Sequence, residues 1–206
     1  MNKKIKILTI VLPIILFLFI AFFLYADFMA HFEGLVYEES VEHMSPALTA
    51  IVKLITAMGS REFVILICFT LFAVPYLRKR YALPISAAVI LSLLLNLLFK
   101  SIFARSRPDI LMLAQETSYS FPSGHSMVSM TLYGAFVLLA WKHMDDRYAK
   151  VIVSLICAAL IGAIGFSRIY LGVHYVTDVV GGWCLGLAIA CSVVYRYERI
   201  VKTRIR

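Results

Sequence analysis

Six long uncharged runs dominate the chain, and each approaches the length of a membrane-spanning helix. A helix needs about 20 predominantly apolar residues to cross a bilayer. Several runs are slightly shorter, which we attribute to a thin bilayer and to snorkelling of flanking basic side chains such as Arg61 and Arg78. The pattern predicts an all-α integral membrane bundle of six transmembrane helices, forming a single domain over residues 1–206. The runs are 7–25, 63–77, 81–99, 124–141, 151–167 and 179–195.

The segment between the first two runs, 26–61, is mixed and net acidic. Within it, apolar residues recur at the helical spacing i, i+3, i+4, i+7, and Ser45-Pro46 is a typical helix start. This helix is too short to span a bilayer, so we expect a short interfacial helix in the first outer loop. An alternative that fits equally well is that the same helix packs over the bundle. The apolar residues are Leu48, Ile51, Val52 and Ile55.

The composition supports the membrane assignment. Hydrophobic residues make up 62% of the 206 residues and charged residues 16%, whereas soluble domains are about a quarter charged. The net charge of +8 comes largely from both chain ends and from 78–80. This placement suits an anionic inner leaflet better than nucleic acid. The four cysteines form no CxxC pair and are expected to be buried small apolar residues. They are Cys68, Cys157, Cys184 and Cys191.

Basic residues also predict the orientation of the bundle. Lys3, Lys4 and Lys6 precede the first run and place the N-terminus in the cytoplasm. We interpret 7–25 as an uncleaved transmembrane helix rather than a signal peptide, because its core is long and no clear small-x-small cleavage site follows. Six spans then return the C-terminus to the cytoplasm. The expected localisation is a multi-pass protein of the cell membrane.

This topology places three polar clusters on the extracytoplasmic side. The first contains Lys100, Arg105 and Arg107. Positive charge in an outer loop runs against the positive-inside rule, so we expect it to have a local use. The clusters span 100–108, 122–125 and 167–178.

The second cluster, Pro122-Ser123-Gly124-His125, has the features of an anion site. Pro122 disfavours helix for the residue before it, and Ser123 is a good N-cap. Gly124 lets another group approach the backbone, and His125 would lie in the first helical turn beside free N–H groups. By itself the motif is weak, because Ser-Gly is common at helix starts.

The third cluster places His174 and Asp178 four residues apart. In a helix they would share one face. A carboxylate there fixes the imidazole tautomer and stabilises the imidazolium. A capping histidine beside an N-terminal aspartate is the structural alternative.

Taken together, the clusters predict a site for a multiply charged anion. A charge inside a membrane helix costs about 2.5–3.5 kcal/mol, so a functional use is expected. Three permanent cations and two imidazoles around one carboxylate favour phosphate. Two histidines and an aspartate also resemble a zinc set, but the neighbouring cations would repel a metal. The residues are Lys100, Arg107, His125, Arg168, His174 and Asp178.

The motifs Lys-x6-Arg-Pro, Pro-Ser-Gly-His and Ser-Arg-x5-His-x3-Asp occur in this order over 100–178. They resemble the three signature blocks of the type 2 phosphatidic acid phosphatases, membrane lipid phosphatases related to vanadium haloperoxidases. In size and layout the chain is similar to bacterial phosphatidylglycerophosphate and undecaprenyl pyrophosphate phosphatases. All three blocks match, which is far more specific than any single block.

The resemblance implies metal-free phosphoryl transfer in two steps, without a cofactor. His174 would attack phosphorus and form a phosphohistidine, while Asp178 orients its ring. His125 would protonate the leaving group and then activate water. A phosphoryl transition state needs positioning and charge stabilisation above all. The implied phosphate-binding residues are Lys100, Arg107, Ser123, Gly124 and Arg168.

We therefore expect a hydrolase that removes a terminal phosphate from a bilayer lipid at the extracytoplasmic surface. Candidate substrates are phosphatidylglycerophosphate, undecaprenyl pyrophosphate and phosphatidic acid. We expect the lipid to reach the site beside the helices that start at Gly124 and Val179. A lipid phosphotransferase and a non-catalytic lipid or anion transporter are the competing functions.

Overall fold

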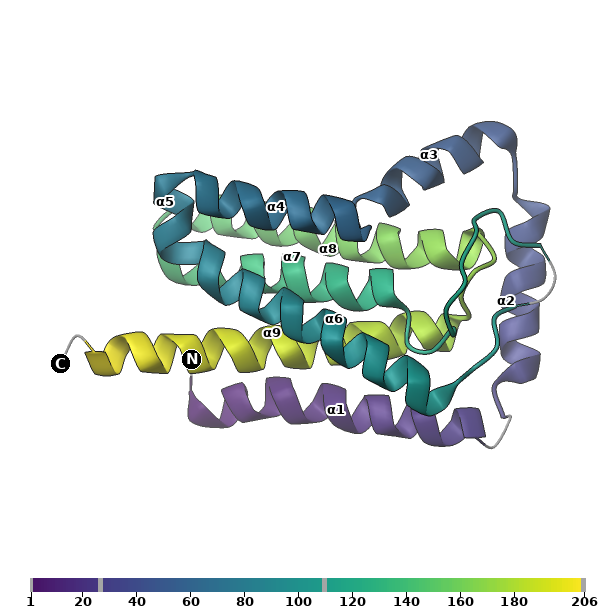
Figure 1. The fold of residues 1–206 in the computed structure, drawn as a ribbon, viewed down its shortest axis with the longest axis horizontal. Helices are drawn as coiled ribbons and strands as arrows, with labels where there is room; N and C mark the ends of the chain where they lie inside the picture. Colours follow the sequence, from purple (N-terminus) through teal and green to yellow (C-terminus); the bar gives the residue numbers. More distant parts are fainter. Residues whose placement is uncertain (1, 26–27, 109–110, 205–206) are drawn as a thin grey trace.

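The computed structural model describes residues 2–25, 28–108 and 111–204, and every regular element within these ranges is a helix (Figure 1). The all-α prediction is confirmed. The elements are α1 (Lys3–Tyr25), α2 (Ala30–Glu42), α3 (Pro46–Ala57), α4 (Arg61–Ala73), α5 (Pro75–Leu77), the π-helical turn η1 (Arg78–Ala82), α6 (Leu83–Phe103), α7 (Gly124–His143), α8 (Arg147–Tyr170) and α9 (Val176–Arg204).

In the described part of the chain, four helical segments are long and apolar enough to cross a membrane, and the pair α3 and α4, bent by 43°, makes a fifth candidate. α7 falls outside this set because it carries polar side chains, including Ser126, Ser129 and Thr131, that are buried within the bundle. The number six therefore stays a prediction. The four segments are Lys3–Leu24, Arg80–Phe103, Arg147–Tyr170 and Val176–Val201.

The core is built around α7, which packs against α6, α8 and α9. Two glycines one turn apart let α9 approach α7 closely. A Cβ added at Gly182 would lie 2.7 Å from the carbonyl oxygen of Ser123, and one at Gly186 would lie 2.5 Å from that of Met127. Small residues four apart allow such contacts between membrane helices. This packing does not fit the expected lipid passage between the starts of α7 and α9.

Many large apolar side chains on the outside of the bundle are exposed, as expected where helices face lipid rather than water. They occur on most of the long helices. Examples are Leu12 at 58% exposure, Phe22 at 68%, Leu94 at 59% and Leu155 at 65%.

One end of the bundle is covered by α2, which runs across the ends of the long helices, while the start of α1 and the end of α9 lie toward the opposite end (Figure 1). The sequence did not predict α2, because its apolar residues follow no regular helical spacing. α3 is confirmed as a helix and is capped by Ser45, whose hydroxyl accepts from the Leu48 N–H. It packs against α8, as one of the two interpretations proposed.

One helix end differs from its prediction, whereas the cysteines are as expected. The predicted run 63–77 ends as a helix at Ala73, and Pro75 begins a new turn that leads through η1 into α6. The cysteines are free and buried, except for Cys68, which is partly buried.

Candidate active site

The polar residues singled out in the sequence come together at the end of the bundle that α2 covers. A cavity of about 130 Å³ opens there. Five residues of the predicted site line it: Lys100, Arg107, Gly124, His125 and His174. Gly59, Arg61, Leu93, Asn96, Glu116, Ser118 and Val128 complete the lining.

The Pro-Ser-Gly-His segment enters α7 as its residue types predict. Ser123 is the N-cap, and its hydroxyl accepts from the N–H of Ser126 at 3.5 Å and from the Ser126 hydroxyl at 3.0 Å. A Cβ on Gly124 would lie 3.1 Å from Asn96 Oδ1, so glycine permits this close approach of α6. His125 follows in the first turn, at the cavity wall.

His174 and Asp178 are in contact, although not as two residues of one helix. His174 lies in the turn before α9, and Asp178 lies in the first turn of that helix. His174 Nδ1 is 3.2 Å from Asp178 Oδ2. The helical spacing predicted the contact, but the structure achieves it by a turn followed by a helix start.

The partners of the ring identify its tautomer. His174 Nε2 lies 3.3 Å from Arg107 Nη1, and a guanidinium only donates hydrogen bonds. Nε2 must therefore accept, and the proton belongs on Nδ1, where it is donated to Asp178. This arrangement leaves the lone pair of His174 on the cavity side.

Burial sets the charge of the resting ring. The His174 side chain is almost fully buried. Burial lowers the pKa of His174 to about 4, against the opposing effect of the Asp178 carboxylate. The imidazole is therefore neutral at physiological pH and carries a lone pair that can attack an electrophile.

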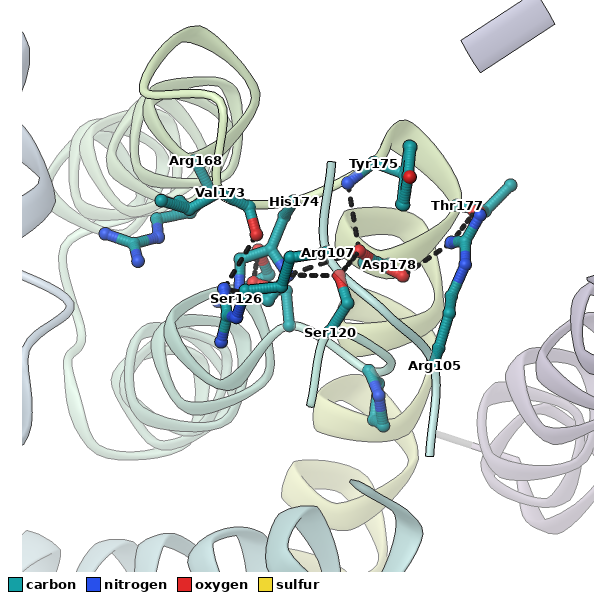
Figure 2. Close-up of polar contacts among 12 residues, drawn as sticks. Arg105, Arg107, Ser120, Ser126, Arg168, Val173, His174, Tyr175, Thr177 and Asp178 are labelled. Atoms are coloured by element: carbon teal, nitrogen blue, oxygen red, sulfur yellow. Dashed lines mark hydrogen bonds and ion pairs between the residues drawn. The ribbon is translucent and has the colours of Figure 1, made fainter. Parts of the chain in front are cut away.

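Asp178 is fully buried and hydrogen-bonded on both oxygens (Figure 2). Arg105 Nη1 donates to Oδ1 at 2.7 Å. Oδ2 accepts from the Ser120 hydroxyl and from the Tyr175 N–H, the latter at 2.9 Å. Sequence reasoning assigned no role to Ser120 and only an unspecified local one to Arg105.

The first predicted cation, Lys100, points from α6 toward the loop that precedes α7. Its ammonium donates to the Tyr119 carbonyl and, at 3.3 Å, to the Ser118 hydroxyl. Arg107 contacts the same loop, donating to the Ser118 carbonyl at 2.7 Å, and also donates to the Val173 carbonyl at 2.7 Å. Both cations thus tie the loop to the cavity wall.

Arg168, near the end of α8, is buried. It donates to the Thr56 hydroxyl at 3.0 Å and forms an ion pair with Glu116. Its Nε has no hydrogen-bond partner among the described residues. Glu116 also lies 3.5 Å from Arg107. This carboxylate, which the sequence did not single out, bridges two of the three cations predicted to bind phosphate.

The arrangement brings a neutral histidine, a second histidine and two of the three predicted cations, Lys100 and Arg107, to one small cavity. The third cation, Arg168, does not line the cavity but pairs with Glu116, which does. Within the described residues, no group of three or more His, Cys, Asp or Glu side chains is placed to hold a metal. Chemically, the site is suited to an anion that reacts with an imidazole nitrogen.

Comparison with known proteins identifies the family of the chain. A family model described as the PAP2 superfamily matches residues 81–202. The chain belongs to the PAP2 superfamily. The matched region contains all three motif blocks found in the sequence.

Two curated relatives share part of their length with this chain. It is 41% identical over 113 residues to phosphatidylglycerophosphatase B of Bacillus subtilis, an alignment covering 54% of this chain and 55% of the relative. It is 29% identical over 132 residues to an undecaprenyl-diphosphatase of Sulfolobus acidocaldarius, covering 61% and 60%. The chain thus aligns with little more than half the length of these relatives.

Solved structures extend the likeness in three dimensions. The crystal structure of a transmembrane PAP2-type phosphatidylglycerolphosphate phosphatase from Bacillus subtilis matches with a TM-score of 0.84 and 31% identity, covering 94% of this chain and 98% of that one. LpxE of Aquifex aeolicus matches with a TM-score of 0.64 and 23% identity, covering 77% and 92%, which shows a shared fold. The apolar helices and these relatives establish a multi-pass membrane protein.

Proposed function

We propose that this protein is a lipid phosphatase that removes a terminal phosphate from a membrane lipid through a phosphohistidine on His174. One observation carries the proposal. His174 presents Nε2 to the cavity wall beside Arg107, while its Nδ1 is held by Asp178. This is the arrangement of an oriented nucleophile.

In the first step, His174 Nε2 forms a bond to phosphorus, and the bond from phosphorus to the lipid oxygen breaks. The leaving oxygen takes a proton from His125, which lines the same cavity and enters this step as a protonated imidazolium. Proton donation of this kind contributes roughly 10²–10⁴-fold. The ring of His174 becomes positively charged, and Asp178 stabilises that charge.

In the second step, water attacks phosphorus and the bond to Nε2 breaks. His125, now neutral, accepts the proton of the attacking water. Inorganic phosphate leaves, and both imidazoles return to their starting forms. Two histidines are needed because one ring cannot both attack phosphorus and protonate the leaving group.

Lys100, Arg107 and Arg168 bind the phosphate oxygens in this proposal, assisted by Ser123 and the Gly124 N–H at the start of α7. Phosphate would then displace Glu116 from its two arginines. The cations supply the charge stabilisation that many phosphoryl-transfer enzymes obtain from metal ions. The proposed reaction is accordingly independent of metal, and a chelator should leave the activity intact.

The lipid phosphate is proposed to enter from the extracytoplasmic half of the bilayer, with both termini in the cytoplasm. In support of this orientation, the start of α1 and the end of α9 lie toward the end of the bundle opposite α2 (Figure 1). Leu93 of α6 and Val128 of α7 line the cavity. Arg61, at the start of α4, lines it as well. We therefore propose that the lipid tails approach beside α4 and α6, rather than between α7 and α9.

Phosphatidylglycerophosphate is the first substrate to test, given what the Bacillus subtilis relatives are named for. Undecaprenyl pyrophosphate and phosphatidic acid follow. The experiment is to measure inorganic phosphate released from each lipid in mixed micelles by the purified protein. Release that depends on His174 and persists with chelator is expected. Strong inhibition by chelator would overturn the metal-free proposal.

The same assay separates the competing functions. A phosphotransferase would move phosphate to an added acceptor lipid without releasing a matching amount of inorganic phosphate. A transporter would bind the lipid without altering it. Either result would contradict the phosphatase proposal.

A further inference from the structure

A largely buried ion-pair network extends from Asp178 through residues that do not line the cavity. Arg105, in the loop after α6, places one guanidinium nitrogen on each of two carboxylates. Nη1 is 2.7 Å from Asp178 Oδ1, and Nη2 is 2.6 Å from Glu33 Oε2. Glu33 belongs to α2, so the network joins the covering helix to the first turn of α9.

Thr177 and Tyr175 complete the contacts of Arg105 and Glu33. Thr177 accepts from Arg105 Nη1 at 2.9 Å and donates to the second oxygen of Glu33. The guanidinium lies over the ring of Tyr175, 4.0 Å from its centroid. Burial lowers the pKa of Arg105, but the two carboxylates outweigh this effect and hold the pKa above its usual range. Arg105 is thus permanently charged.

Glu33 is unusual for a residue on a helix at the edge of the fold, because it is only 4% exposed. Burying a carboxylate costs desolvation energy even when the group is paired, as Glu33 is with Arg105, so a functional use is expected. The other acidic residues of α2 (Glu38, Glu39 and Glu42) are exposed. Burial therefore distinguishes Glu33 from its neighbours on the same helix.

The charges suggest what Glu33 does. Two carboxylates share one guanidinium, which leaves one excess negative charge beside the neutral ring of His174. If Glu33 were uncharged, Arg105 would neutralise Asp178 alone. The positive charge that develops on His174 during attack would then gain less from that carboxylate. Glu33 draws part of Arg105 away from Asp178 and leaves Asp178 free to support the imidazolium.

We propose that Arg105 and Glu33 are positioning residues that act through Asp178, fixing its orientation and preserving its charge for His174. This inference rests on the proposed function, since it assumes that His174 is the nucleophile. It also makes α2 part of the catalytic architecture, because the helix carries one member of the network.

A purely structural role is the alternative, in which Glu33 only fastens α2 to the bundle. The structure offers a matched control. Tyr37, one turn further along α2, also fastens the helix, with its hydroxyl donating to the Leu111 carbonyl at 2.9 Å. No hydrogen bond between Tyr37 and Asp178 or His174 occurs in the described chain. Tyr37→Phe therefore removes an anchor of α2 without changing the charge network.

The experiment compares Glu33→Gln, Arg105→Gln and Tyr37→Phe in detergent, with Glu38→Gln as a surface control. For each, kcat and KM are measured with the lipid phosphate that the wild-type protein hydrolyses, and the melting temperature is recorded. We expect Glu33→Gln and Arg105→Gln to lower kcat by roughly 10–100-fold, by analogy with the partners that orient metal-ligating side chains. KM should stay unchanged, because neither residue lines the cavity.

Two conservative variants keep the proposal testable if the glutamines fail to fold. Arg105→Lys and Glu33→Asp retain both charges and should recover part of kcat. Tyr37→Phe should lower the melting temperature while kcat stays at the wild-type level. The rate of phosphoenzyme formation in a single turnover should fall in parallel with kcat for Glu33→Gln.

Glu33→Gln with wild-type kcat would overturn the proposal, as would a loss of kcat in Tyr37→Phe equal to that in Glu33→Gln. Failure of the underlying function has a different signature. If His174→Ala retained turnover, the nucleophile assignment would fall. If His174→Ala were inactive but Arg105→Gln were fully active, only the positioning role would be wrong.

Discussion

The two ends of the bundle carry charge in contrasting ways. At the end covered by α2, Arg105 contacts Asp178 and Glu33, whose side chains alone are 0% and 2% exposed, at 2.7 and 2.6 Å. At the opposite end, Glu198 pairs with Lys6 at 3.7 Å and Lys142 at 3.3 Å, and the lysines are 34% and 31% exposed. The first set is buried and closely paired, and the second is loose and solvated.

The difference indicates which charged residues contribute to catalysis. Exposed ion pairs contribute little to stability, often less than about 1 kcal/mol. Buried charges are costly and are retained only with well-placed partners. Substitutions of the buried charged residues around His174 and Asp178 should therefore impair turnover strongly, and those of the ion pairs around Glu198 should leave it unchanged. The predictions below test this contrast, from the largest effect to the smallest.

The largest effect is expected for Asp178→Asn. The amide keeps the shape but removes the charge that supports His174 and the preference for the Nδ1–H tautomer. A loss of kcat on the order of 10⁴-fold is expected, by analogy with the aspartate of a serine protease triad. The matched variant at the opposite end, Glu198→Gln, should retain full kcat. Similar activity of the two variants in the phosphate-release assay would contradict the proposed difference between the two ends of the bundle.

A smaller effect is expected for Arg107→Gln, which removes a cation from the cavity wall beside His174 Nε2. Loss of one donor to a transition-state oxygen typically costs roughly 10²–10³-fold in kcat. Lys142→Gln is the control, because this lysine pairs with Glu198 at the end of the bundle opposite the site. Steady-state kinetics with the same lipid substrate measures both. An Arg107→Gln enzyme with unchanged kcat would exclude the arginine from the phosphate site.

The protonation of His174 provides a third test. The pKa of His174 is lowered to about 4 by burial, below the usual value of about 6.5. The ring is neutral above that pKa, and the nucleophile is lost as pH falls through it. An NMR titration of the histidine ring protons, with the His174 signal assigned from its absence in His174→Ala, should give a midpoint near 4. A midpoint near 6.5 would contradict the account of the buried ring.

The smallest effect concerns Glu116, whose carboxylate lies between Arg107 and Arg168. Removing its charge by Glu116→Gln should let an anion bind more easily, because it no longer competes for the two guanidinium groups. Vanadate inhibition should tighten by a few fold, in line with about 0.2–1 kcal/mol for a partly exposed pair. Glu62→Gln, which changes an exposed carboxylate of α4, is the control. Weaker inhibition in Glu116→Gln would mean that Glu116 helps to bind the anion.

Sequence patterns predicted the helices with strong apolar runs and the histidines and cations that line the cavity. These residues stand at fixed spacing in motifs, and their polar character is conspicuous at the ends of apolar runs. The i, i+4 spacing of His174 and Asp178 also predicted a contact, although through a helix that starts only after His174. Ser123 was correctly expected to cap α7.

The rest of the site depends on contacts between distant segments. Glu33 reaches Arg105 across 72 positions of the chain, and Ser120 reaches Asp178 across 58. No local pattern marks a glutamate on a polar helix as buried, or a loop serine as the partner of a carboxylate. α2 itself was missed because its buried side includes Glu33, Tyr37 and Ser40 instead of a regular apolar stripe.

The most direct test of the central claim is to locate the phosphoenzyme. The protein is mixed with a lipid carrying a labelled terminal phosphate, quenched in alkali within one turnover and mapped by mass spectrometry. The account predicts phosphate on the imidazole of His174, absent in His174→Ala and accumulating in His125→Ala. Labelled phosphate on another residue, or turnover without any phosphoenzyme while His174→Ala remains active, would contradict it.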